Sequence, residues 1–209
     1  MRMRRLKWAS QFLKDSEIVI HEPEEMAGRW SECYGVKSIH VEIGTGKGDY
    51  WIGMSQLYPD SLWIGIEKNE SVAAQAVKKS GEISKNRCFI YGDASELDRW
   101  FKEGEVDVIH LNFSDPWPKN RNKKRRLSHP AFLLRYKKIL KKNGQIQMKT
   151  DNVSLFEYSM LEFLESGFHL IEFSVDFRRE KHDEDVISEY ERKFMEQGNP
   201  IYRAVWQND

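Results

Sequence analysis

From residue 38 onward, short apolar runs alternate with longer amphipathic stretches, and this alternation restricts the possible folds more than any other feature of the chain. The apolar runs have the length of strands, and the stretches between them have the length of helices. Strands that alternate with helices at this spacing form a parallel sheet covered on both faces. The predicted strands are 39–43, 62–66, 88–91, 106–113, 145–149, 168–175 and 201–206.

The order of these elements predicts an α/β, doubly wound fold. The last two strands are not separated by a clear helix but by a charged linker, so we expect them to form an antiparallel hairpin at one edge of a mostly parallel seven-stranded sheet. A chain of 209 residues suits one such domain. We therefore expect residues 1–36 to form an N-terminal extension and residues 37–209 to form the domain.

Charge and cysteine content exclude several classes of protein. The 33 basic and 33 acidic residues balance, which argues against a uniform polycation but says nothing about where the charges lie. Cys33 and Cys88 are far apart and form no CxxC pair, which argues against a disulfide framework and a thiolate metal site. Neither a signal peptide nor an apolar run of roughly 20 residues is present. These features predict a cytoplasmic protein without a metal or a membrane span.

A glycine-rich turn follows the first predicted strand. Its spacing is GxGxG, with Gly44, Gly46 and Gly48, and Glu42 stands two residues before it. The dinucleotide pattern GxGxxG instead aims a helix N-terminus at a pyrophosphate. The turn therefore suits a ligand without phosphates, and Glu42 suits an ammonium group; the alternative is a plain tight turn.

Carboxylates also end the next two strands. Glu67 can accept hydrogen bonds from both hydroxyls of a ribose, and Asp93, which precedes Ala94, can accept one from the exocyclic amine of adenine. Ligands of open α/β sheets bind at the carboxyl ends of the strands, where these acids lie. The set matches the ammonium, ribose and adenine of S-adenosylmethionine, although each acid could be a helix cap. The predicted cofactor-binding residues of this region are Glu42, Gly44, Gly46, Glu67, Asp93 and Ala94.

The segment 111–119 after the fourth strand is the most specific part of the chain. Pro116 and Pro118 stiffen the backbone on either side of Trp117. A rigid loop with one carboxylate and one aromatic ring can hold a flat base, and Asp115 can accept from the adjacent N1–H and N2–H donors of guanine. Adenine and cytosine do not offer that donor pair, so the loop favours guanine.

A concentrated basic segment follows this loop. Residues 118–149 contain twelve Lys or Arg and no Asp or Glu. Contacts from such side chains to RNA phosphates give affinity and salt dependence but little specificity for the RNA sequence. A target base that is stacked in the RNA must also leave its stack to reach an enzyme pocket. A solvated helix explains Lys137, Lys138, Lys141 and Lys142 equally well. The predicted RNA-binding residues are Arg121, Asn122, Lys123, Lys124, Arg125 and Arg126, and the N-terminal arm (Arg2, Arg4, Arg5 and Lys7) could add to them.

Over nearly its whole length, the chain resembles the bacterial tRNA (guanine-N7)-methyltransferases. The resemblance rests on the glycine turn, Gly65-Ile66-Glu67, Asp93-Ala94, segments 112–119, 124–127, 149–152, 155–159 and 188–191, and Phe194, Gly198 and Ile201-Tyr202-Arg203. It implies a Rossmann-like methyltransferase sheet, S-adenosylmethionine as cofactor, and tRNA as partner, with a variable-loop guanosine (position 46) as the target. It also implies that Asp115 lines the cofactor pocket at the catalytic centre. The substrate-binding residues implied by the resemblance are Lys119, Asp151, Ser188, Glu189, Tyr190 and Glu191.

Several positions depart from the common family pattern. Thr45 replaces Cys or Ser, Asn122 replaces His, Ser188 replaces Thr, and Asp176-Phe177 replaces Asp-Leu. None of these changes removes a carboxylate that the chemistry needs. Two of the motifs also have a structural explanation, because Asp151-Asn152 can be a helix N-cap and Ser188-x-x-Glu191 a capping box.

N7 of guanine carries a lone pair and no proton, so the predicted reaction needs alignment and exclusion of water but no general base. Two alternatives remain open on the sequence. One is an amino-methyltransferase acting on adenine N6 or cytosine N4, although Asp115 stands where such enzymes carry the first proline of their motif. The other is a non-catalytic RNA-binding relative. A dehydrogenase is disfavoured by the glycine spacing, and the sequence allows either a monomer or a homodimer.

Overall fold

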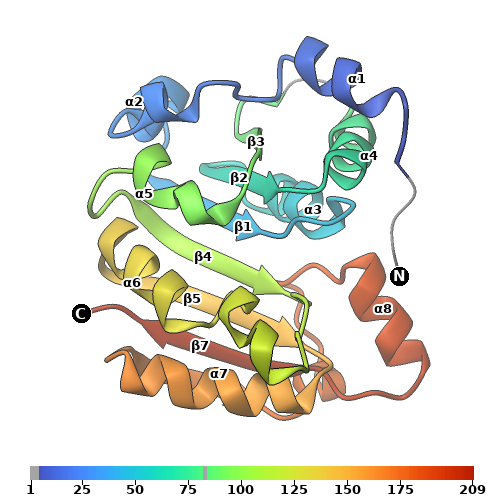
Figure 1. The fold of residues 1–209 in the computed structure, drawn as a ribbon, viewed down its shortest axis with the longest axis vertical. Coiled ribbons are helices and arrows are strands. Elements are labelled where there is room, and N and C mark those ends of the chain that lie inside the picture. Colours follow the sequence, from blue (N-terminus) through green and yellow to red (C-terminus); the bar gives the residue numbers. More distant parts are fainter. Residues whose placement is uncertain (1–4, 82–83) are drawn as a thin grey trace. The chain divides into compact units, whose positions relative to one another are not determined.

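The computed structural model describes residues 5–81 and 84–209, and its contacts divide the chain into two compact units, Met1–Lys102 (unit 1) and Glu103–Asp209 (unit 2) (Figure 1). Together the units contain a seven-stranded sheet, mostly parallel with antiparallel strands at one edge, which confirms the predicted fold class. Arg2 and Arg4 of the predicted RNA-binding arm lie outside the described residues.

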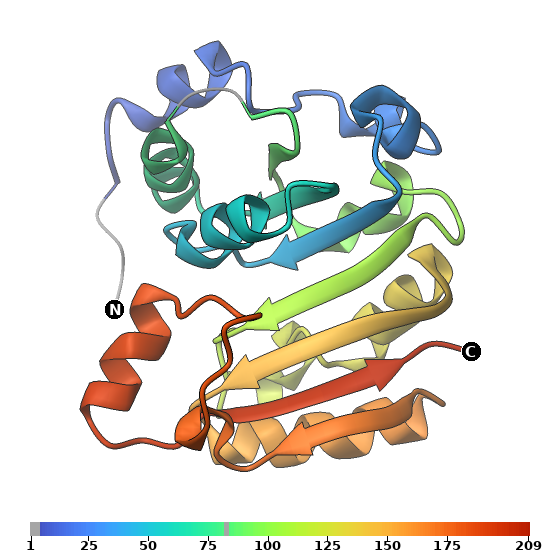
Figure 2. The same cartoon turned by 180° about the vertical axis from the view of Figure 1, so that it is seen from behind.

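Unit 1 is built on three parallel strands in the order β3-β2-β1. The strands are β1 (Ser38–Ile43), β2 (Ser61–Glu67) and β3 (Arg87–Tyr91). The helices are α1 (Ala9–Asp15), η1 (Pro23–Met26), α2 (Trp30–Tyr34), α3 (Asp49–Leu57), α4 (Glu70–Ser80), η2 (Ala94–Glu96) and α5 (Leu97–Trp100). Figures 1 and 2 show α3 and α5 on opposite faces of these strands, as a doubly wound fold requires.

Small residues let α3 and α4 approach each other closely. Ala73, Ala74 and Ala76 of α4 are fully buried. A Cβ atom at Gly48, which precedes α3, would lie 3.1 Å from the Cβ of Ala76. Gly48 also has a positive φ of 85°, which a side chain rarely adopts. The last glycine of the predicted turn therefore lets the start of α3 pack against α4.

The N-terminal extension packs into unit 1. The Ile20 amide donates to the Phe89 carbonyl at 2.8 Å, and the Phe89 amide donates to the Ile18 carbonyl at 2.9 Å. These bonds cover the outer edge of β3, which would otherwise expose unpaired backbone groups. Helix α1 contacts α4, and the Leu6 amide donates to Ser71 Oγ at 2.9 Å. The domain boundary after residue 36 stays a prediction.

Unit 2 has its strands in the order β4-β5-β7-β6. The strands are β4 (Val106–Asn112), β5 (Leu140–Thr150), β6 (His169–Ser174) and β7 (Tyr202–Gln207). The helices are η3 (Asn120–Arg125), α6 (Pro130–Ile139), α7 (Val153–Glu165), η4 (Phe177–Arg179) and α8 (Glu189–Glu196). Strand β7 runs antiparallel to both β5 and β6, between which it lies (Figure 2), so the predicted antiparallel hairpin is confirmed. In both views α6 and α7 cover the same face of these strands.

Two elements of unit 2 differ from the prediction. Strand β5 begins at Leu140 instead of residue 145, and its pairing with β4 shifts register near Val108. Asn143 adopts a positive φ of 63° in this irregular stretch, which hides the start of the strand from a periodicity analysis. The expected charged linker between β6 and β7 contains the helix α8. The charged side chains on this helix made it look like a loop.

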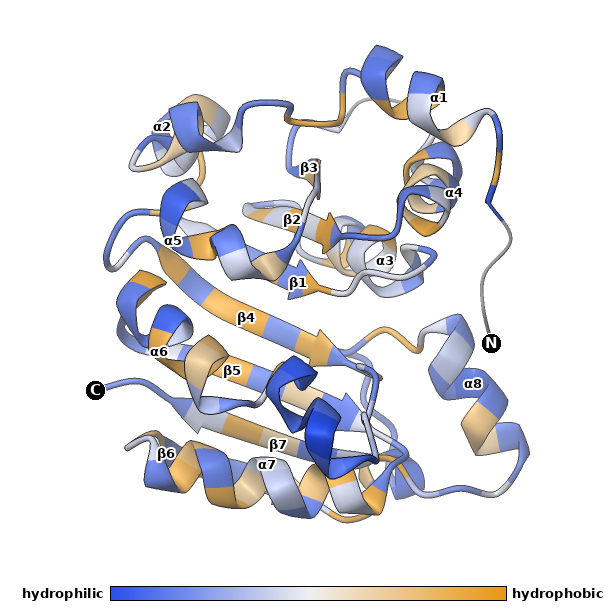
Figure 3. Ribbon diagram, viewed as in Figure 1, coloured by the Kyte–Doolittle hydropathy of each residue, from blue (hydrophilic) through white to orange (hydrophobic). Residues whose placement is uncertain are grey.

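Aromatic side chains fill the core of each unit. Trp30, Trp51 and Trp63 are the largest fully buried side chains of unit 1. In unit 2, Phe163 of α7 stacks on Trp206 of β7 with ring centroids 3.9 Å apart, which fixes α7 to the sheet. Figure 3 shows apolar segments on β4, β5 and β7 that alternate with hydrophilic ones, and a strongly hydrophilic helix η3. Among the described residues, no helix has the length and hydropathy needed to cross a bilayer.

Candidate cofactor and guanosine sites

The glycine turn of unit 1 folds back onto the end of β2. The amides of Gly44 and Thr45 donate to the Ile66 carbonyl at 2.8 and 3.1 Å. Gly44 and Gly46 both have positive φ values, 78° and 58°, and a Cβ atom at Gly44 would meet nothing within 4 Å. At Gly44 the turn therefore exposes bare backbone, which a ligand can approach closely.

Glu67 joins this turn to the end of β2. Its carboxylate accepts from the Gly46 amide at 3.3 Å and from the Asn69 amide at 2.8 Å. Burial raises the pKa of Glu67, while these backbone hydrogen bonds and Lys68 act in the opposite direction. A half-buried carboxylate held in this way keeps lone pairs for two further donors, which is the number that a ribose diol presents.

The other two predicted cofactor acids differ in exposure. Glu42 is only 2% exposed at the end of β1, where it pairs in register with Gly65. Asp93 is exposed and caps η2 by accepting from the Ser95 amide at 2.9 Å. Burial raises the pKa of Asp93, but the hydrogen bonds from Ser95 and the charge of Lys68 outweigh it, so the net shift is downward. The helix-cap interpretation of Asp93 is thus correct, and it leaves the second carboxylate oxygen facing Lys68 at 3.5 Å.

Backbone pairing brings the three strand ends of unit 1 together. The Gly92 amide, which precedes Asp93, donates to the Glu67 carbonyl at 3.2 Å. The Gly46 amide reaches Glu67 from the other side. Unit 1 therefore brings the glycine turn, Glu67 and the end of β3 that precedes Asp93 together, and Ala94 is buried. That these residues bind a cofactor stays a prediction.

The segment after β4, residues 113–118, is named here the reaction loop. It starts and ends in strained backbone, because Phe113 and Trp117 have positive φ values of 50° and 42°. Such conformations in non-glycine residues cost about 1–3 kcal/mol each and persist where the surroundings hold them. The Phe113 amide donates to the Lys149 carbonyl at 2.8 Å, which places the loop beside the end of β5. Asp115 is exposed on this loop.

Asp151 lies immediately after β5, near the reaction loop. The helix cap of α7 is its neighbour Asn152, whose side chain accepts from the Leu155 amide at 2.8 Å. Asp151 itself is half-buried, and burial raises its pKa. The cap function therefore belongs to Asn152, and the Asp151 carboxylate is available for a polar ligand beside the reaction loop.

The segment 188–191 forms the start of α8. Ser188 and Glu191 make a complete capping box, because the Glu191 amide donates to Ser188 Oγ at 3.1 Å and the Ser188 amide donates to Glu191 Oε2 at 3.4 Å. Tyr190 is 53% exposed, whereas Glu191 is fully buried. Helix α8 reaches the reaction loop through Phe194, which stacks on Phe113.

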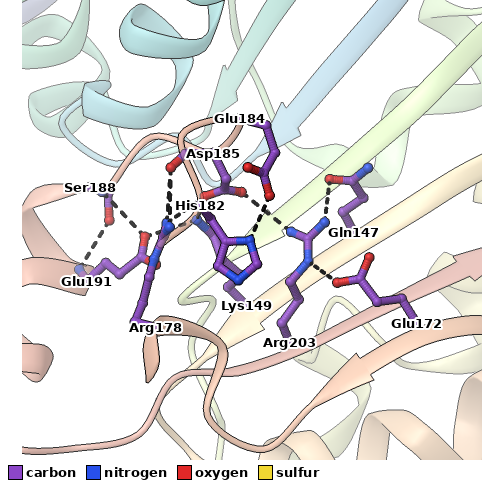
Figure 4. A network of polar contacts seen from close by, with 10 residues as sticks. All are labelled: Gln147, Lys149, Glu172, Arg178, His182, Glu184, Asp185, Ser188, Glu191 and Arg203. Carbon is purple, nitrogen blue, oxygen red and sulfur yellow. Dashed lines mark hydrogen bonds and ion pairs between the residues drawn. The ribbon is translucent and has the colours of Figure 1, made fainter. Parts of the chain in front are cut away.

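Glu191 belongs to a buried group of charged side chains that we name the ion cluster (Figure 4). The cluster contains three cations and three carboxylates: Lys149, Arg178, Arg203, Asp185, Glu191 and Glu172. Lys149 Nζ is 2.9 Å from Glu191 Oε2 and also contacts Asp185. Arg178 donates to both acids at 2.6 Å.

Arg203 of β7 completes the ion cluster at its rim. It donates to Glu172 of β6 at 2.8 Å and approaches Asp185 at 3.4 Å. Burial lowers the pKa of Arg178, but the hydrogen bonds and charges of Glu191 and Asp185 outweigh it and raise the pKa. The cluster has as many cations as carboxylates. This balance is needed because a buried charge without an opposite charge beside it would strongly destabilise the fold. The cluster thereby fixes the chain before α8 to the ends of β5 and β7.

The predicted RNA-binding residues occupy a segment that we name the basic loop, residues 119–126. Arg121, Lys123, Lys124 and Arg125 are exposed, as is Lys119, and Asn122 is half-buried. Arg125 lies over the Trp117 ring at 4.8 Å. Arg126 differs from the others, because it is only 6% exposed and donates to backbone carbonyls of the reaction loop.

Unit 2 therefore places the reaction loop beside the end of β5 and Asp151, whereas Glu191, one of the predicted substrate residues, is buried and ion-paired within the protein. Sequence reasoning missed the ion cluster, in which Lys149 and Arg203 were noted only as parts of motifs and Arg178 and Asp185 were given no role. The sequence carried no clear signal for it, because Lys149 ends a strand that also contains Gln145 and Gln147, and only the structure shows that this lysine is buried and so needs an acidic partner. The part of the chain that the structure describes contains no group of His, Cys, Asp and Glu side chains arranged for a metal ion.

Comparisons with known proteins identify the family of the chain. A family model described as "Putative methyltransferase" matches residues 36–204. The curated tRNA (guanine-N(7)-)-methyltransferase of Bacillus velezensis is 44% identical over 209 residues, which cover 98% of this chain and 95% of that protein. The protein of the same description from Oceanobacillus iheyensis is 42% identical over 207 residues, which cover 98% of this chain and 97% of that protein.

Solved structures support the fold. A structure described as an antibiotic-related methyltransferase has a TM-score of 0.62 at 18% identity and covers 85% of this chain and 92% of its own. A mutant 16S rRNA (adenine(1408)-N(1))-methyltransferase from Catenulisporales acidiphilia, solved with its cosubstrate SAM, has a TM-score of 0.60 at 13% identity, with 89% and 91% covered. Identities this low speak for the methyltransferase fold alone. Since the family model spans most of the chain and relatives more than 40% identical cover nearly all of it, the chain belongs to the tRNA (guanine-N(7)-)-methyltransferase family.

Proposed function

We propose that this protein transfers the methyl group of S-adenosylmethionine to N7 of a guanosine in the variable loop of tRNA. The observation that carries the proposal is the match, over nearly the full length of both chains, to relatives named for guanine-N7 methylation of tRNA. The same match disfavours methylation of adenine N6 or cytosine N4. The sheet edges of the two units supply the residue types that the reaction needs.

The residues of unit 1 suit the cofactor. The glycine turn offers open backbone, Glu67 offers acceptors for a ribose diol, and Asp93 offers one for an exocyclic amine. When bound, S-adenosylmethionine supplies a methyl group on a positively charged sulfur. The buried carboxylate of Glu42 would attract the positive charge of its amino-acid part.

The residues of unit 2 suit the guanosine. Asp115 would accept from N1–H and N2–H of the base, and Asp151 would favour the positive charge that the ring gains on methylation at N7. No proton leaves N7, so these carboxylates orient the base and stabilise charge without acting as general bases. Lys119, Ser188, Glu189 and Tyr190 would complete the pocket, and the exposed cations of the basic loop would hold the tRNA backbone.

The test is methyl transfer from labelled S-adenosylmethionine to an unmodified tRNA transcript, followed by nucleoside analysis. We expect labelled 7-methylguanosine, and its loss when the variable-loop guanosine is replaced by adenosine. Label on 6-methyladenosine or 4-methylcytidine would replace the proposal with an amino-methyltransferase. Binding of tRNA without any label and without binding of S-adenosylmethionine would instead identify a non-catalytic relative.

Two further points belong to the proposal. We infer a cytoplasmic location, since Cys33 and Cys88 are both free thiols and tRNA is the substrate. The oligomeric state, monomer or homodimer, stays a prediction that light scattering of the purified protein would decide.

A further inference from the structure

Arg126 stands apart from the basic residues that precede it. Arg121, Lys123, Lys124 and Arg125 are exposed, whereas Arg126 is 6% exposed. A side chain so deeply buried cannot offer its charge to a phosphate without leaving its contacts. Its contacts therefore decide what it does.

The Arg126 guanidinium binds the backbone of the reaction loop. Its Nε donates to the Pro116 carbonyl at 2.9 Å, and its terminal nitrogen donates to the Trp117 carbonyl at 3.2 Å. Pro116 and Pro118 have no N–H groups, so the loop has few donors of its own for these carbonyls. One planar guanidinium supplies both hydrogen bonds in a fixed geometry.

These two hydrogen bonds hold a strained stretch of chain. Trp117 has a φ of 42°, and Phe113, at the other end of the loop, has a φ of 50°. A positive φ in a residue other than glycine costs free energy, so the loop needs contacts that favour this conformation over relaxed ones. Asp115 lies between the two strained positions and adjoins Pro116, so its position depends on these contacts.

The other side of Arg126 faces α7. Its guanidinium lies 4.3 Å from the ring centroid of Tyr158, a cation–π contact. Ser159, the next residue, donates to Ser128 at 2.7 Å, which ties α7 to the chain just after Arg126. Helix α7 is capped by Asn152, the neighbour of Asp151. Arg126 therefore connects the loop that carries Asp115 to the helix that follows Asp151.

We propose that Arg126 is a positioning residue for methyl transfer. It fixes the Pro116–Trp117 backbone, and through it Asp115, against α7, and it does not bind a tRNA phosphate. This role rests on the proposed function and revises the place of Arg126 among the predicted RNA-binding residues. A lysine at this position would keep the charge but lose the planar pair of donors and the stacking on Tyr158.

The test compares Arg126→Lys with Arg121→Gln, a change at an exposed cation of the same loop. Turnover number, KM for tRNA and the salt dependence of tRNA binding are measured for both. Arg126→Lys should lower kcat at least about tenfold and leave KM and the salt slope unchanged, because the charge is kept and no phosphate contact is lost. Arg121→Gln should weaken binding and flatten the log–log salt slope by about 0.7–0.9.

Hydrogen exchange of peptides covering residues 113–121 gives a readout that does not need activity. We expect faster exchange in Arg126→Lys than in the wild type, and wild-type exchange in Arg121→Gln. If the wild type formed no 7-methylguanosine, the proposed function would fail, while the exchange comparison would still test the contact of Arg126 with the loop.

Three results would overturn the positioning role. In the first, Arg126→Gln flattens the salt slope as Arg121→Gln does, which would make Arg126 a phosphate contact. In the second, Arg126→Lys matches the wild type in kcat and in loop exchange. In the third, Arg126→Lys does not fold, as judged by circular dichroism, which would make Arg126 a residue of the general fold.

Discussion

The basic loop and the ion cluster of unit 2 contain the same kinds of charged side chain in opposite surroundings. In the basic loop, cations follow one another in sequence and are exposed, apart from Arg126. In the ion cluster, cations from β5, η4 and β7 meet carboxylates that come from distant parts of the chain, and nearly all are buried (Figure 4). Charge that is uncompensated at the surface can attract a polyanion, whereas buried charge must be balanced within the protein.

This difference gives a chain of zero net charge a basic surface on which the proposed binding of tRNA can rest. The acids that balance the total do not lie in residues 118–149, which contain none. Two of those that neutralise buried cations, Asp185 and Glu191, contribute no negative charge to the surface. The distribution of charge therefore matters for function more than its sum.

The largest expected effect breaks the ion cluster. Glu191→Ala leaves Lys149 and Arg178 short of a buried partner and should lower the free energy of unfolding by about 3–5 kcal/mol. At about 2–4 °C per kcal/mol, the melting temperature should fall by roughly 6–20 °C. Differential scanning calorimetry measures the melting temperature.

Glu189→Ala, at an exposed position of the same helix, is the control, and its free energy of unfolding should stay within about 0.5 kcal/mol of the wild-type value. Equal stability of the two variants would contradict the structural role of the cluster.

The second effect removes charge from the basic loop. Changing Arg121, Lys123, Lys124 and Arg125 together to Gln should leave the melting temperature unchanged, since these side chains are exposed. Affinity for tRNA should fall on the order of 100-fold at low salt, and the log–log salt slope should fall by up to about 3.6, which is four times the upper value for one cation. Fluorescence anisotropy over a KCl series measures both quantities.

Lys142→Gln is the matched control for this loop variant, because Lys142 is an exposed cation on β5 outside the basic loop. It should bind tRNA with wild-type affinity and salt slope. A loop variant that keeps the wild-type salt slope would show that the tRNA backbone is bound elsewhere.

The smallest expected effect concerns Asp151, two residues after Lys149 but outside the cluster. Burial raises its folded-state pKa, so the folded state binds this proton more readily than the unfolded state. Stability is therefore lost as pH rises through the interval between the unfolded and folded pKa values. Asp151→Asn removes that penalty and should raise the melting temperature at pH 7 while lowering methyl transfer.

The same reasoning gives the pH dependence that checks this prediction. As pH falls through that interval, Asp151 takes up its proton in both states, and the difference in melting temperature between Asp151→Asn and the wild type should shrink. A difference that grows toward acid pH would contradict the assignment. The Asp151 carboxylate lowers the stability of the fold and lies beside the reaction loop. A residue that is retained although it lowers stability is typical of a functional position.

Local patterns in the sequence predicted much of the fold and the strand ends at which the candidate site lies. The alternation of strands and helices, the glycine turn and the carboxylates at the ends of β1, β2 and β3 follow from rules that act over a few residues. The start of β5 was missed because Asn143 and the register shift break the periodicity there. Helix α8 was read as a linker because its charged surface resembles a loop, although its capping box was visible.

Contacts between distant residues could not be predicted from the sequence. Glu191 meets Lys149 across 42 positions, and only the folded chain shows that its carboxylate is used inside unit 2. Arg126 looks like its neighbours in the sequence, yet it is buried against the reaction loop. A run of like charges indicates that a segment is exposed, but it does not show which of its side chains is buried.

The most direct test of the central claim, that Asp115 on the reaction loop serves methyl transfer to guanosine, is a single-turnover measurement with Asp115→Ala at saturating S-adenosylmethionine and tRNA. We expect 7-methylguanosine to form about 10²–10³-fold more slowly than in the wild type, while the melting temperature and the salt slope of tRNA binding stay unchanged. Asp183→Ala, at an exposed acid of the same unit, should react at the wild-type rate. An Asp115→Ala enzyme that forms 7-methylguanosine as fast as the wild type would contradict the account.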